Sequence, residues 1–253
     1  MAKEKIVLVT GGSRGLGKDM ALSIARKGMD VILTYRSNAE EAEAVTAQVR
    51  EMGRKAVSLQ LDMSQPASLD GFIASVRSVL QSEWNRSGFD VLVNNAGMGA
   101  TVPFTEVTEA LFDDFLNVHF KGVYFLTQKS LPLMSDGGSI INISTGTTRF
   151  SNPGYSVYAS MKGAVEVLTR YLAKELGGRG IRCNVIAPGP VETDFNSAAI
   201  RSNPQMKERL GSLSPLGRVG MADDIGGVVA FLCTEDAKWI NGQRIEVSGG
   251  INV

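Results

Sequence analysis

The sequence predicts a single α/β domain: a doubly wound parallel β-sheet of about seven strands with helices on both faces. Short apolar runs alternate with amphipathic helical stretches along all 253 residues. Most of these runs are apolar without a break, which is typical of parallel strands that are covered on both faces. A glycine-rich turn joins the first run to the first helical stretch. Short connections between alternating elements favour right-handed crossovers, and no linker or repeat divides the chain, so we expect one domain over residues 1–253.

The elements follow one another in a regular order. The predicted strands are 6–9, 31–33, 56–59, 91–93, 139–143, 182–186 and 244–247. The predicted helices are 15–27, 39–52, 66–83, 108–133, 155–177, 196–211 and 222–234. Three helices begin with residues suited to capping: Ser64 with Pro66, Thr108, and the run Ala222-Asp223-Asp224.

Residues 190–220 differ from the rest because they are rich in loop-forming residues, including Pro190, Pro204 and Pro215. A long loop between two elements of a sheet suits a lid or substrate loop. Its apolar residues suggest a partly apolar lid; they are Phe195, Ala198, Ala199, Ile200, Met206, Leu210 and Leu213. Met98, Phe150 and Tyr155 are candidates for the lining of the same cleft.

Composition excludes several classes of function. The chain carries 26 Lys and Arg against 26 Asp and Glu, so no net charge favours nucleic acid or an anionic membrane as a partner. Its apolar runs are too short to span a bilayer, and no secretory signal precedes the first strand, so we expect a cytoplasmic protein. Two cysteines make no disulfide framework, and a single histidine argues against a His-built metal site. Glycine is enriched, at 28 residues or about 11%.

The first strand runs directly into residues 10–17, Thr-Gly-Gly-Ser-Arg-Gly-Leu-Gly, and a helix follows. Glycines at this place permit a tight turn and let the backbone approach a pyrophosphate, which the helix N-terminus then binds. The strand before and the helix after the turn predict a dinucleotide site of the Rossmann type. No Gly-Lys-Ser/Thr follows, which excludes a P-loop.

The end of the second strand indicates which dinucleotide binds. A free ribose 2′-hydroxyl usually meets an Asp or Glu about twenty residues after the turn. This chain instead has Arg36 and Ser37 there, and Arg14 lies within the turn. Two guanidinium groups suit a 2′-phosphate, so the sequence predicts NADP(H) rather than NAD(H). Two solvated surface arginines are the alternative.

The best candidate for chemistry is a tyrosine with a lysine four residues later, Tyr158 and Lys162. On a helix this spacing places both side chains on one face. An ammonium near a phenol is expected to lower the tyrosine pKa toward the working pH, which prepares the phenol for proton exchange with a carbonyl or alcohol oxygen. Tyr155 lacks such a partner and is expected to pack.

With these motifs the chain resembles the short-chain dehydrogenases/reductases of the single-domain branch, notably 3-oxoacyl-carrier-protein reductases and related NADPH-dependent carbonyl reductases. The likeness covers essentially the whole chain. The turn 10–17, Asn-Asn-Ala-Gly at 94–97, Asn117, Tyr158 with Lys162, the segment 188–193 and the closing run 239–243 carry it.

The resemblance implies hydride transfer between a nicotinamide and a carbonyl carbon, with Tyr158 as proton donor, Lys162 bonding the nicotinamide ribose, and Asn117 positioning a water for proton resupply. It implies contacts to NADP(H) from Gly11, Ser13, Arg14, Gly15, Leu16, Gly17, Arg36, Ser37, Asp62, Met63, Asn95, Ala96, Gly97, Tyr158, Lys162, Pro188, Gly189, Val191 and Thr193. Asp62 would bind the adenine ring. His119 is expected to face away, as a packed or surface residue, and no metal is expected.

Two positions depart from the family pattern. Thirteen residues before Tyr158, where the family usually has its catalytic serine, stands Thr145, with Ser144 beside it. Neighbouring side chains on a strand point to opposite faces, so only one is expected to reach the substrate. We expect Thr145 to hold the carbonyl oxygen, with Ser144 as the alternative. Ser248 replaces the aspartate common before Gly249, which affects C-terminal contacts rather than the chemistry.

The substrate is the least determined feature of the sequence. The run 136–138, Asp-Gly-Gly, lacks the basic residues that carrier-protein reductases tend to have there, so we expect a small ketone or related carbonyl compound. A 3-oxoacyl thioester is the alternative, and a non-catalytic NADP(H) sensor or scaffold is a remote one. The resemblance also implies a homotetramer, or a homodimer, formed through the helices 108–133 and 155–177 and the C-terminal strand.

Overall fold

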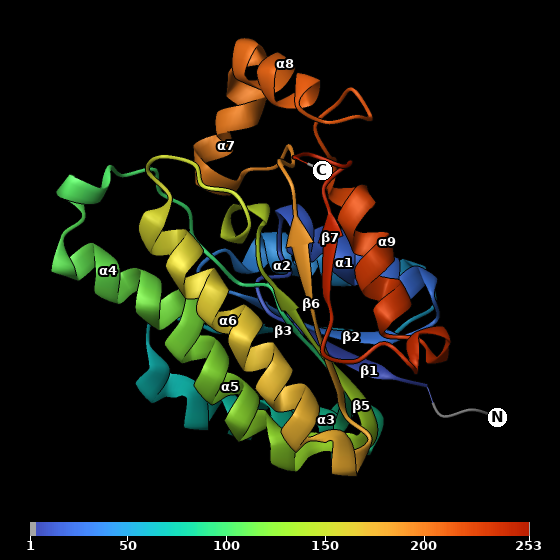
Figure 1. Ribbon diagram of the computed structural model, residues 1–253. Helices are drawn as coiled ribbons and strands as arrows, with labels where there is room; N and C mark the ends of the chain where they lie inside the picture. Colours follow the sequence, from blue (N-terminus) through green and yellow to red (C-terminus); the bar gives the residue numbers. More distant parts are fainter. Residues whose placement is uncertain (1–3, 253) are drawn as a thin grey trace.

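The computed structural model describes residues 4–252, and residues 1–3 and 253 of the expected domain lie outside the described residues (Figure 1). One sheet forms the centre of the molecule, and its seven described strands are all parallel in the order β3-β2-β1-β4-β5-β6-β7. The strands are β1 (Ile6–Val9), β2 (Asp30–Tyr35), β3 (Ala56–Gln60), β4 (Phe89–Asn94), β5 (Met134–Ile143), β6 (Arg182–Pro188) and β7 (Arg244–Val247). The strand order reverses next to β1, which places a ligand crevice at the carboxyl ends of β1 and β4.

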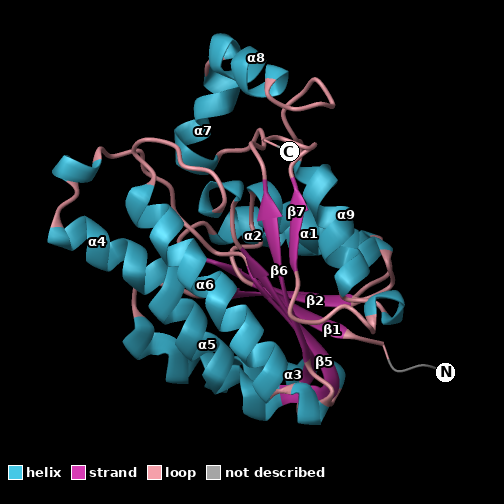
Figure 2. Cartoon of the chain, in the orientation of Figure 1, coloured by secondary structure: helices cyan, strands magenta, loops and turns pink. Residues whose placement is uncertain are grey.

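Helices cover both faces of the sheet, as predicted (Figure 2). One face packs against α1 (Gly15–Arg26), α2 (Ala39–Glu51) and α9 (Ala222–Leu232). The other packs against α3 (Leu69–Trp84), α5 (Gly122–Ser130) and α6 (Ser156–Glu175). Successive side chains of β1 point to opposite faces of the sheet. Val7 and Val9 pack in the core on the α1 side, and Ile6 and Leu8 pack in the core on the α3 side.

The predicted helix 108–133 is interrupted. Thr108 caps α4 (Glu109–Leu116), as expected, by accepting a hydrogen bond from the Leu111 N–H at 3.2 Å. A single π-helical turn, Asn117–Lys121, then separates α4 from α5, and a 3₁₀ turn, Leu131–Leu133, follows. A wide turn of this kind inside an α-helix is uncommon and is frequent at functional sites. Here it lies at the residue that the sequence singled out, Asn117.

Two other boundaries differ from the prediction. The helix 196–211 is two helices, α7 (Phe195–Ser202) and α8 (Pro204–Ser212), because the residue before a proline is restricted to extended backbone, as Asn203 is with φ −128° and ψ 95°. Ser64 does not cap the next helix, since its hydroxyl donates to the Asp62 carboxylate at 2.7 Å and a 3₁₀ turn begins at Pro66.

The segment expected to act as a lid lies beyond the carboxyl end of β6, where α7 and α8 stand clear of the sheet (Figure 1). Its base is held by two hydrogen bonds of 2.9 Å, from the Gly220 N–H to the Pro190 carbonyl and from the Glu192 N–H to the Gly220 carbonyl. Within residues 4–252, none of the helices has the combination of length and apolar character that crossing a bilayer requires. The described residues also include no cluster of three or more His, Cys, Asp or Glu side chains suited to a metal ion.

Candidate active site

The glycine turn between β1 and α1 has the backbone that the sequence predicted. Gly11 and Gly15 have φ of +63° and +54°, a region that other residues rarely adopt. Gly17 lies against the carbonyl of Gly11, and a side chain there would also come within 2.5 Å of the Asn95 amide nitrogen. The turn is therefore packed too closely for any residue larger than glycine at position 17.

The N-terminus of α1 is left open toward this turn. Arg14 occupies the capping position with extended backbone, its side chain makes no capping hydrogen bond, and the first turn of the helix contains no acidic residue. The free N–H groups and the positive end of the helix dipole therefore face the space next to Ser13, Gly15 and Leu16. Such a helix end binds phosphate groups.

The end of β4 fixes the turn through Thr10 and Asn95. The Thr10 hydroxyl accepts hydrogen bonds of 2.9 Å from the N–H groups of Asn95 and Ala96. In return, the Asn95 amide donates to the carbonyls of Thr10 at 2.9 Å and Gly11 at 3.1 Å. Gly97 follows, where a side chain would come within 3.0 Å of the His119 ring. The segment 95–97 is thereby placed beside the turn, as expected.

The residues expected to meet the adenosine half gather at the ends of β2 and β3. The Arg36 Nε lies 3.3 Å from the Asp62 carboxylate, and 72% of the Arg36 side chain is exposed. Burial disfavours the Asp62 anion, but hydrogen bonds from Ser64 and the charge of Arg36 outweigh it and lower the Asp62 pKa below 3.8. Ser37 is exposed, and Met63 is buried against the π-helical turn at Gly122.

Arg14 does not contact Arg36 or Asp62 in this structure. Its guanidinium donates to the carbonyl of Asp194 at 3.4 Å, across the crevice. Thr193 lies beside Gly15, and its hydroxyl accepts from the Phe195 N–H at 3.2 Å. The segment that follows β6 therefore reaches the glycine turn.

The remaining residues of the 188–193 segment are held by the C-terminal strand. The Gly189 N–H donates to the Val247 carbonyl at 3.0 Å, and Gly189 packs so closely on Ser248 that a side chain would lie 2.8 Å from it. Pro188 is buried at the end of β6, and Val191 forms a bridge to Gly220. Ser248, which stands where the family commonly has aspartate, thus packs tightly against the backbone of Gly189.

Tyr158 and Lys162 come from the first turns of α6 and lie together at the end of β5. The Lys162 Nζ is buried, donates to the Ile143 carbonyl at 2.7 Å, and lies 5.8 Å from the centre of the Tyr158 ring. Burial lowers the Lys162 pKa from 10.5 to about 8. The predicted lowering of the Tyr158 pKa is wrong for this structure: burial raises it, and the Thr145 hydroxyl offsets only part of the rise. Lys162 loses its charge at a lower pH than that at which the buried phenol titrates, so it does not lower the Tyr158 pKa.

Thr145 and Ser144 point to opposite sides, as their positions on the extended chain require. The Thr145 hydroxyl lies on the Tyr158 side and also accepts a hydrogen bond from the Thr147 N–H at 3.3 Å. The Ser144 hydroxyl donates to the Glu166 carboxylate at 2.6 Å. The geometry therefore brings Thr145, and not Ser144, to the tyrosine.

His119 is packed, but it does not face away from the site. Its ring contacts the Tyr158 ring edge-on with centres 5.1 Å apart and stacks on Phe115 at 5.3 Å. Its Nε2 lies 2.8 Å from the Met98 carbonyl oxygen. The π-helical turn rotates this position inward relative to a regular helix. Burial, and then the charge of Lys162, lower the His119 pKa well below 6.5, so the ring is neutral.

Two further aromatic rings lie beside the Tyr158 ring. The ring centre of Phe195, from the lid, lies 6.0 Å from that of Tyr158, and the ring centre of Tyr155 lies 6.5 Å from it. Phe150 packs instead against Gly146, behind the loop that carries Thr145. Met98 contacts the small apolar cluster around Phe115. The expected lining is therefore divided, with only Tyr155 and Phe195 of these residues next to the Tyr158 ring.

Asn117 begins the π-helical turn, and its carbonyl accepts from the Gly122 N–H. Sequence reasoning missed Glu166, which stands four residues after Lys162 on the same helical face; the spacing Tyr-x₃-Lys-x₃-Glu was the available signal.

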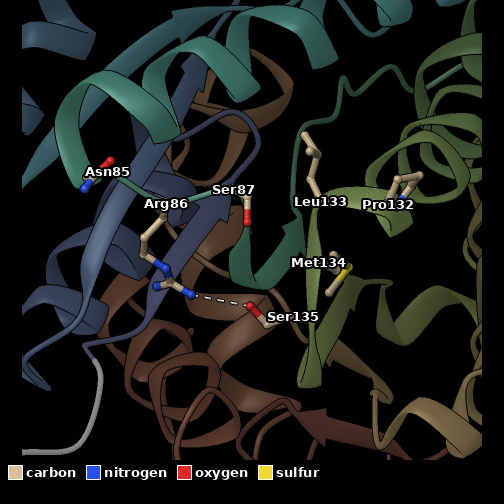
Figure 3. Close-up of a pocket in the computed structure, with 8 residues that line it drawn as sticks. Asn85, Arg86, Ser87, Pro132, Leu133, Met134 and Ser135 are labelled. Carbon is tan, nitrogen blue, oxygen red and sulfur yellow. Dashed lines mark hydrogen bonds between the residues drawn. The ribbon is translucent and has the colours of Figure 1, made fainter.

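A cavity of about 140 Å³ lies under the lid, between Val191 and Ser248. A larger one, of about 280 Å³, opens at the amino ends of β4 and β5 beside Arg86 and Ser135 and shares no residue with this site (Figure 3).

Comparison with known proteins agrees with this geometry. The profile of the family described as enoyl-(acyl carrier protein) reductase matches residues 11–252. A 3-oxoacyl-[acyl-carrier-protein] reductase FabG of Staphylococcus aureus is 36% identical over 99% of both chains. The tetrahydroxynaphthalene reductase PfmaG of Pestalotiopsis fici is 34% identical over 97% of this chain and 91% of its own. The structure of the angucycline C-6 ketoreductase LanV with bound NADP superposes with a TM-score of 0.93 at 36% identity, covering 98% of this chain and 95% of that one.

These likenesses extend over the whole dinucleotide crevice and the tyrosine–lysine pair, and each exceeds 30% identity. The chain belongs to the short-chain dehydrogenase/reductase family of oxidoreductases.

Proposed function

We propose that this protein reduces a ketone to an alcohol with NADPH, using Tyr158 as the general acid. The observation that carries the proposal is the meeting of Tyr158, Lys162 and Thr145 at the end of β5, beside an uncapped helix N-terminus. A nicotinamide cofactor bound there would supply the hydride. The chain itself has to supply the proton and hold the carbonyl group.

The proton is assigned to the Tyr158 phenol. Because burial raises its pKa, this group stays protonated at neutral pH and is ready to donate to a carbonyl oxygen that acquires charge. The Thr145 hydroxyl, on the same side, donates the second hydrogen bond to that oxygen. With the cofactor bound, Lys162 would bond the nicotinamide ribose, and Asn117 would position a water that returns a proton toward Lys162.

The residues of the crevice fit NADP(H). Gly17 lets the turn pack tightly against Asn95, and the open end of α1 suits a pyrophosphate. Arg36 is exposed at the end of β2, next to Asp62, where a 2′-phosphate would extend. Its guanidinium supports the preference for NADP(H) over NAD(H), as does the NADP bound to the related ketoreductase LanV.

The walls beside Tyr158 suit a cyclic or aromatic ketone. The rings of Tyr155 and Phe195 offer flat apolar surface on which such a substrate can stack. The related tetrahydroxynaphthalene reductase and angucycline ketoreductase are named for ring-bearing substrates.

A 3-oxoacyl thioester is the second candidate, and the FabG relative favours it. Docking of an acidic carrier protein near the start of β5 would need free positive charge there. Arg179 is already paired with Asp136 at 2.7 Å and donates to the carbonyls of Leu131 and Met134. This pairing argues against the thioester.

The test is NADPH oxidation, followed by absorbance, with 2-tetralone, cyclohexanone and acetoacetyl-coenzyme A as substrates and NADH in parallel. We expect the highest kcat/KM with 2-tetralone and NADPH, and a loss of at least about 100-fold in Tyr158→Phe. Highest activity with acetoacetyl-coenzyme A would favour the thioester. Tight NADPH binding without oxidation of any substrate would favour a sensor or scaffold.

We also propose that the chain assembles as a homotetramer, or as a homodimer. Tyr124 and Phe125 on α5 and Val167 and Tyr171 on α6 are large apolar side chains that are 37–64% exposed. An apolar patch of this kind supports an interface between copies. Analytical ultracentrifugation of the intact protein tests this, and a single monomeric species at micromolar concentration would contradict it.

A further inference from the structure

Behind Thr145, on the side away from the substrate, three donors meet one carboxylate oxygen. Glu166 Oε1 accepts hydrogen bonds from the Ser144 hydroxyl at 2.6 Å, the Thr148 hydroxyl at 2.7 Å and the Arg244 Nε at 2.9 Å. The Glu166 side chain is 13% exposed and that of Arg244 is 23% exposed. Charge-assisted hydrogen bonds to a largely buried group hold their partners firmly.

Arg244 extends this cluster to Thr145 itself. Its Nη2 donates to the Thr145 carbonyl at 3.2 Å, and its Nη1 donates to the Glu246 carboxylate at 2.8 Å. The Thr148 hydroxyl also lies 2.9 Å from the Thr145 carbonyl, and its single proton is donated either to that carbonyl or to Glu166. The backbone of Thr145 is therefore fixed on both flanks and at its own carbonyl by groups from α6 and β7.

The direction of the Thr145 hydroxyl follows from this arrangement. Ser144 is drawn toward Glu166, and on extended backbone the next side chain must point the other way, toward Tyr158. Glu166 stands four residues after Lys162 on the same face of α6, so one helix carries the acid, the lysine and this carboxylate.

We propose that Glu166 is a positioning residue which, with Arg244, holds the Thr145 hydroxyl in place to receive the substrate carbonyl. This inference rests on the proposed function, because it assigns Glu166 a purpose only if Thr145 acts in the reaction. Glu166 does not touch the substrate, and its whole effect passes through Thr145.

The first measurement compares Glu166→Gln with wild type in NADPH-dependent reduction of 2-tetralone. Glutamine keeps the shape but loses the charge that the three donors share. We expect kcat to fall about tenfold, with KM for NADPH within about twofold, because misplacement of a catalytic donor affects the transition state. Glu175→Gln, the same change on the exposed end of α6, should leave both values unchanged.

The second measurement combines the change with Thr145→Ala. If Glu166 acts through Thr145, Glu166→Gln should lower kcat by less than about twofold when the hydroxyl is already absent. Arg244→Lys, which keeps the charge but loses the planar fork, should behave in the same way and serves as the probe if Glu166→Gln does not fold.

The outcomes separate the two proposals. If Thr145→Ala is strongly impaired and Glu166→Gln still lowers kcat a further tenfold in that variant, the positioning role is overturned and the proposed function stands. An unimpaired Thr145→Ala would remove Thr145 from the reaction and overturn the positioning role, whereas failure of the wild type to reduce any ketone with NADPH would overturn the proposed function. A loss confined to KM for NADPH would also contradict the positioning role, because it would place the effect of Glu166 at the cofactor.

Discussion

Replacing Lys162 by Met is expected to stabilise the cofactor-free protein at neutral pH while abolishing its activity. The ammonium of Lys162 is buried, and burial lowers its pKa from 10.5 to about 8. Between these two pH values the unfolded chain binds more protons at this residue than the folded chain does. The free energy of unfolding contributed by Lys162 therefore rises with pH over that window and is least favourable below pH 8.

The size of the effect follows from the two pKa values. At roughly 1.4 kcal/mol per pKa unit, the difference corresponds to a destabilisation of about 3 kcal/mol at pH 7, and about 1 kcal/mol of it remains at pH 10. Lys162→Met removes this contribution but also removes the hydrogen bond to the Ile143 carbonyl, a loss of about 1 kcal/mol. That loss is similar at both pH values, so the pH dependence isolates the charge.

The assay is urea unfolding of wild type and Lys162→Met at pH 7 and pH 10, without NADP(H). We expect the stability of the variant relative to wild type to be about 2 kcal/mol greater at pH 7 than at pH 10. Lys174→Met, at an exposed position of the same helix, should show no such difference between the two pH values. Equal relative stabilities at pH 7 and pH 10, or a larger gain at pH 10, would refute the reasoning.

Three further changes test the cofactor site and the hydroxyl donor. Arg36→Asp should lower the ratio of kcat/KM for NADPH to that for NADH by at least about tenfold, because a charge-assisted bond to the 2′-phosphate is lost; an unchanged ratio in steady-state kinetics would sink the assignment. Thr145→Ala should reduce kcat by about 100-fold, whereas Ser144→Ala should change it by less than about threefold; the reverse pattern would move the donor role to Ser144. Gly17→Ala should lower the free energy of unfolding by about 1–3 kcal/mol and weaken NADPH binding, since its methyl group has no room. Thermal unfolding with and without NADPH measures both effects, and Gly227→Ala, on an exposed helical face with open space, should not destabilise.

The sequence was sufficient for features whose cause is local. The inner strands are buried on both faces, which leaves an unbroken apolar run such as that of β1; all seven strands overlap their predicted ranges, and β5 begins at Met134 rather than at residue 139. The spacing of Tyr158 and Lys162 needs only one helix turn, and both residues lie at the end of β5. The glycine turn required the positive φ values that Gly11 and Gly15 have.

Other features depend on partners that are distant in the chain. Glu166 meets Arg244 across 78 positions, and no local pattern announces that contact. The π-helical turn at Asn117–Lys121 brings His119 against Tyr158, whereas regular helical spacing predicted the opposite direction. The Tyr158 pKa was predicted from the neighbouring charge alone, but it depends on burial, which a sequence does not give.

The order of strands in the sheet also has a consequence for synthesis of the chain on the ribosome. β2 can pair with one edge of β1 soon after it is synthesised, but the other edge of β1 stays unpaired until β4 is made. In the same way β4, β5 and β6 each keep one unpaired edge until the next strand is made. Until β7 has been synthesised, the last strand of the nascent chain has apolar side chains and unpaired backbone N–H and C=O groups. Other chains can pair with such an edge. β7 ends the exposure of β6 by pairing with it, and Arg244 and Glu246 give this last strand a polar sequence in which the two side chains pair at 2.8 Å. The strand that completes the sheet thereby protects it from aggregation.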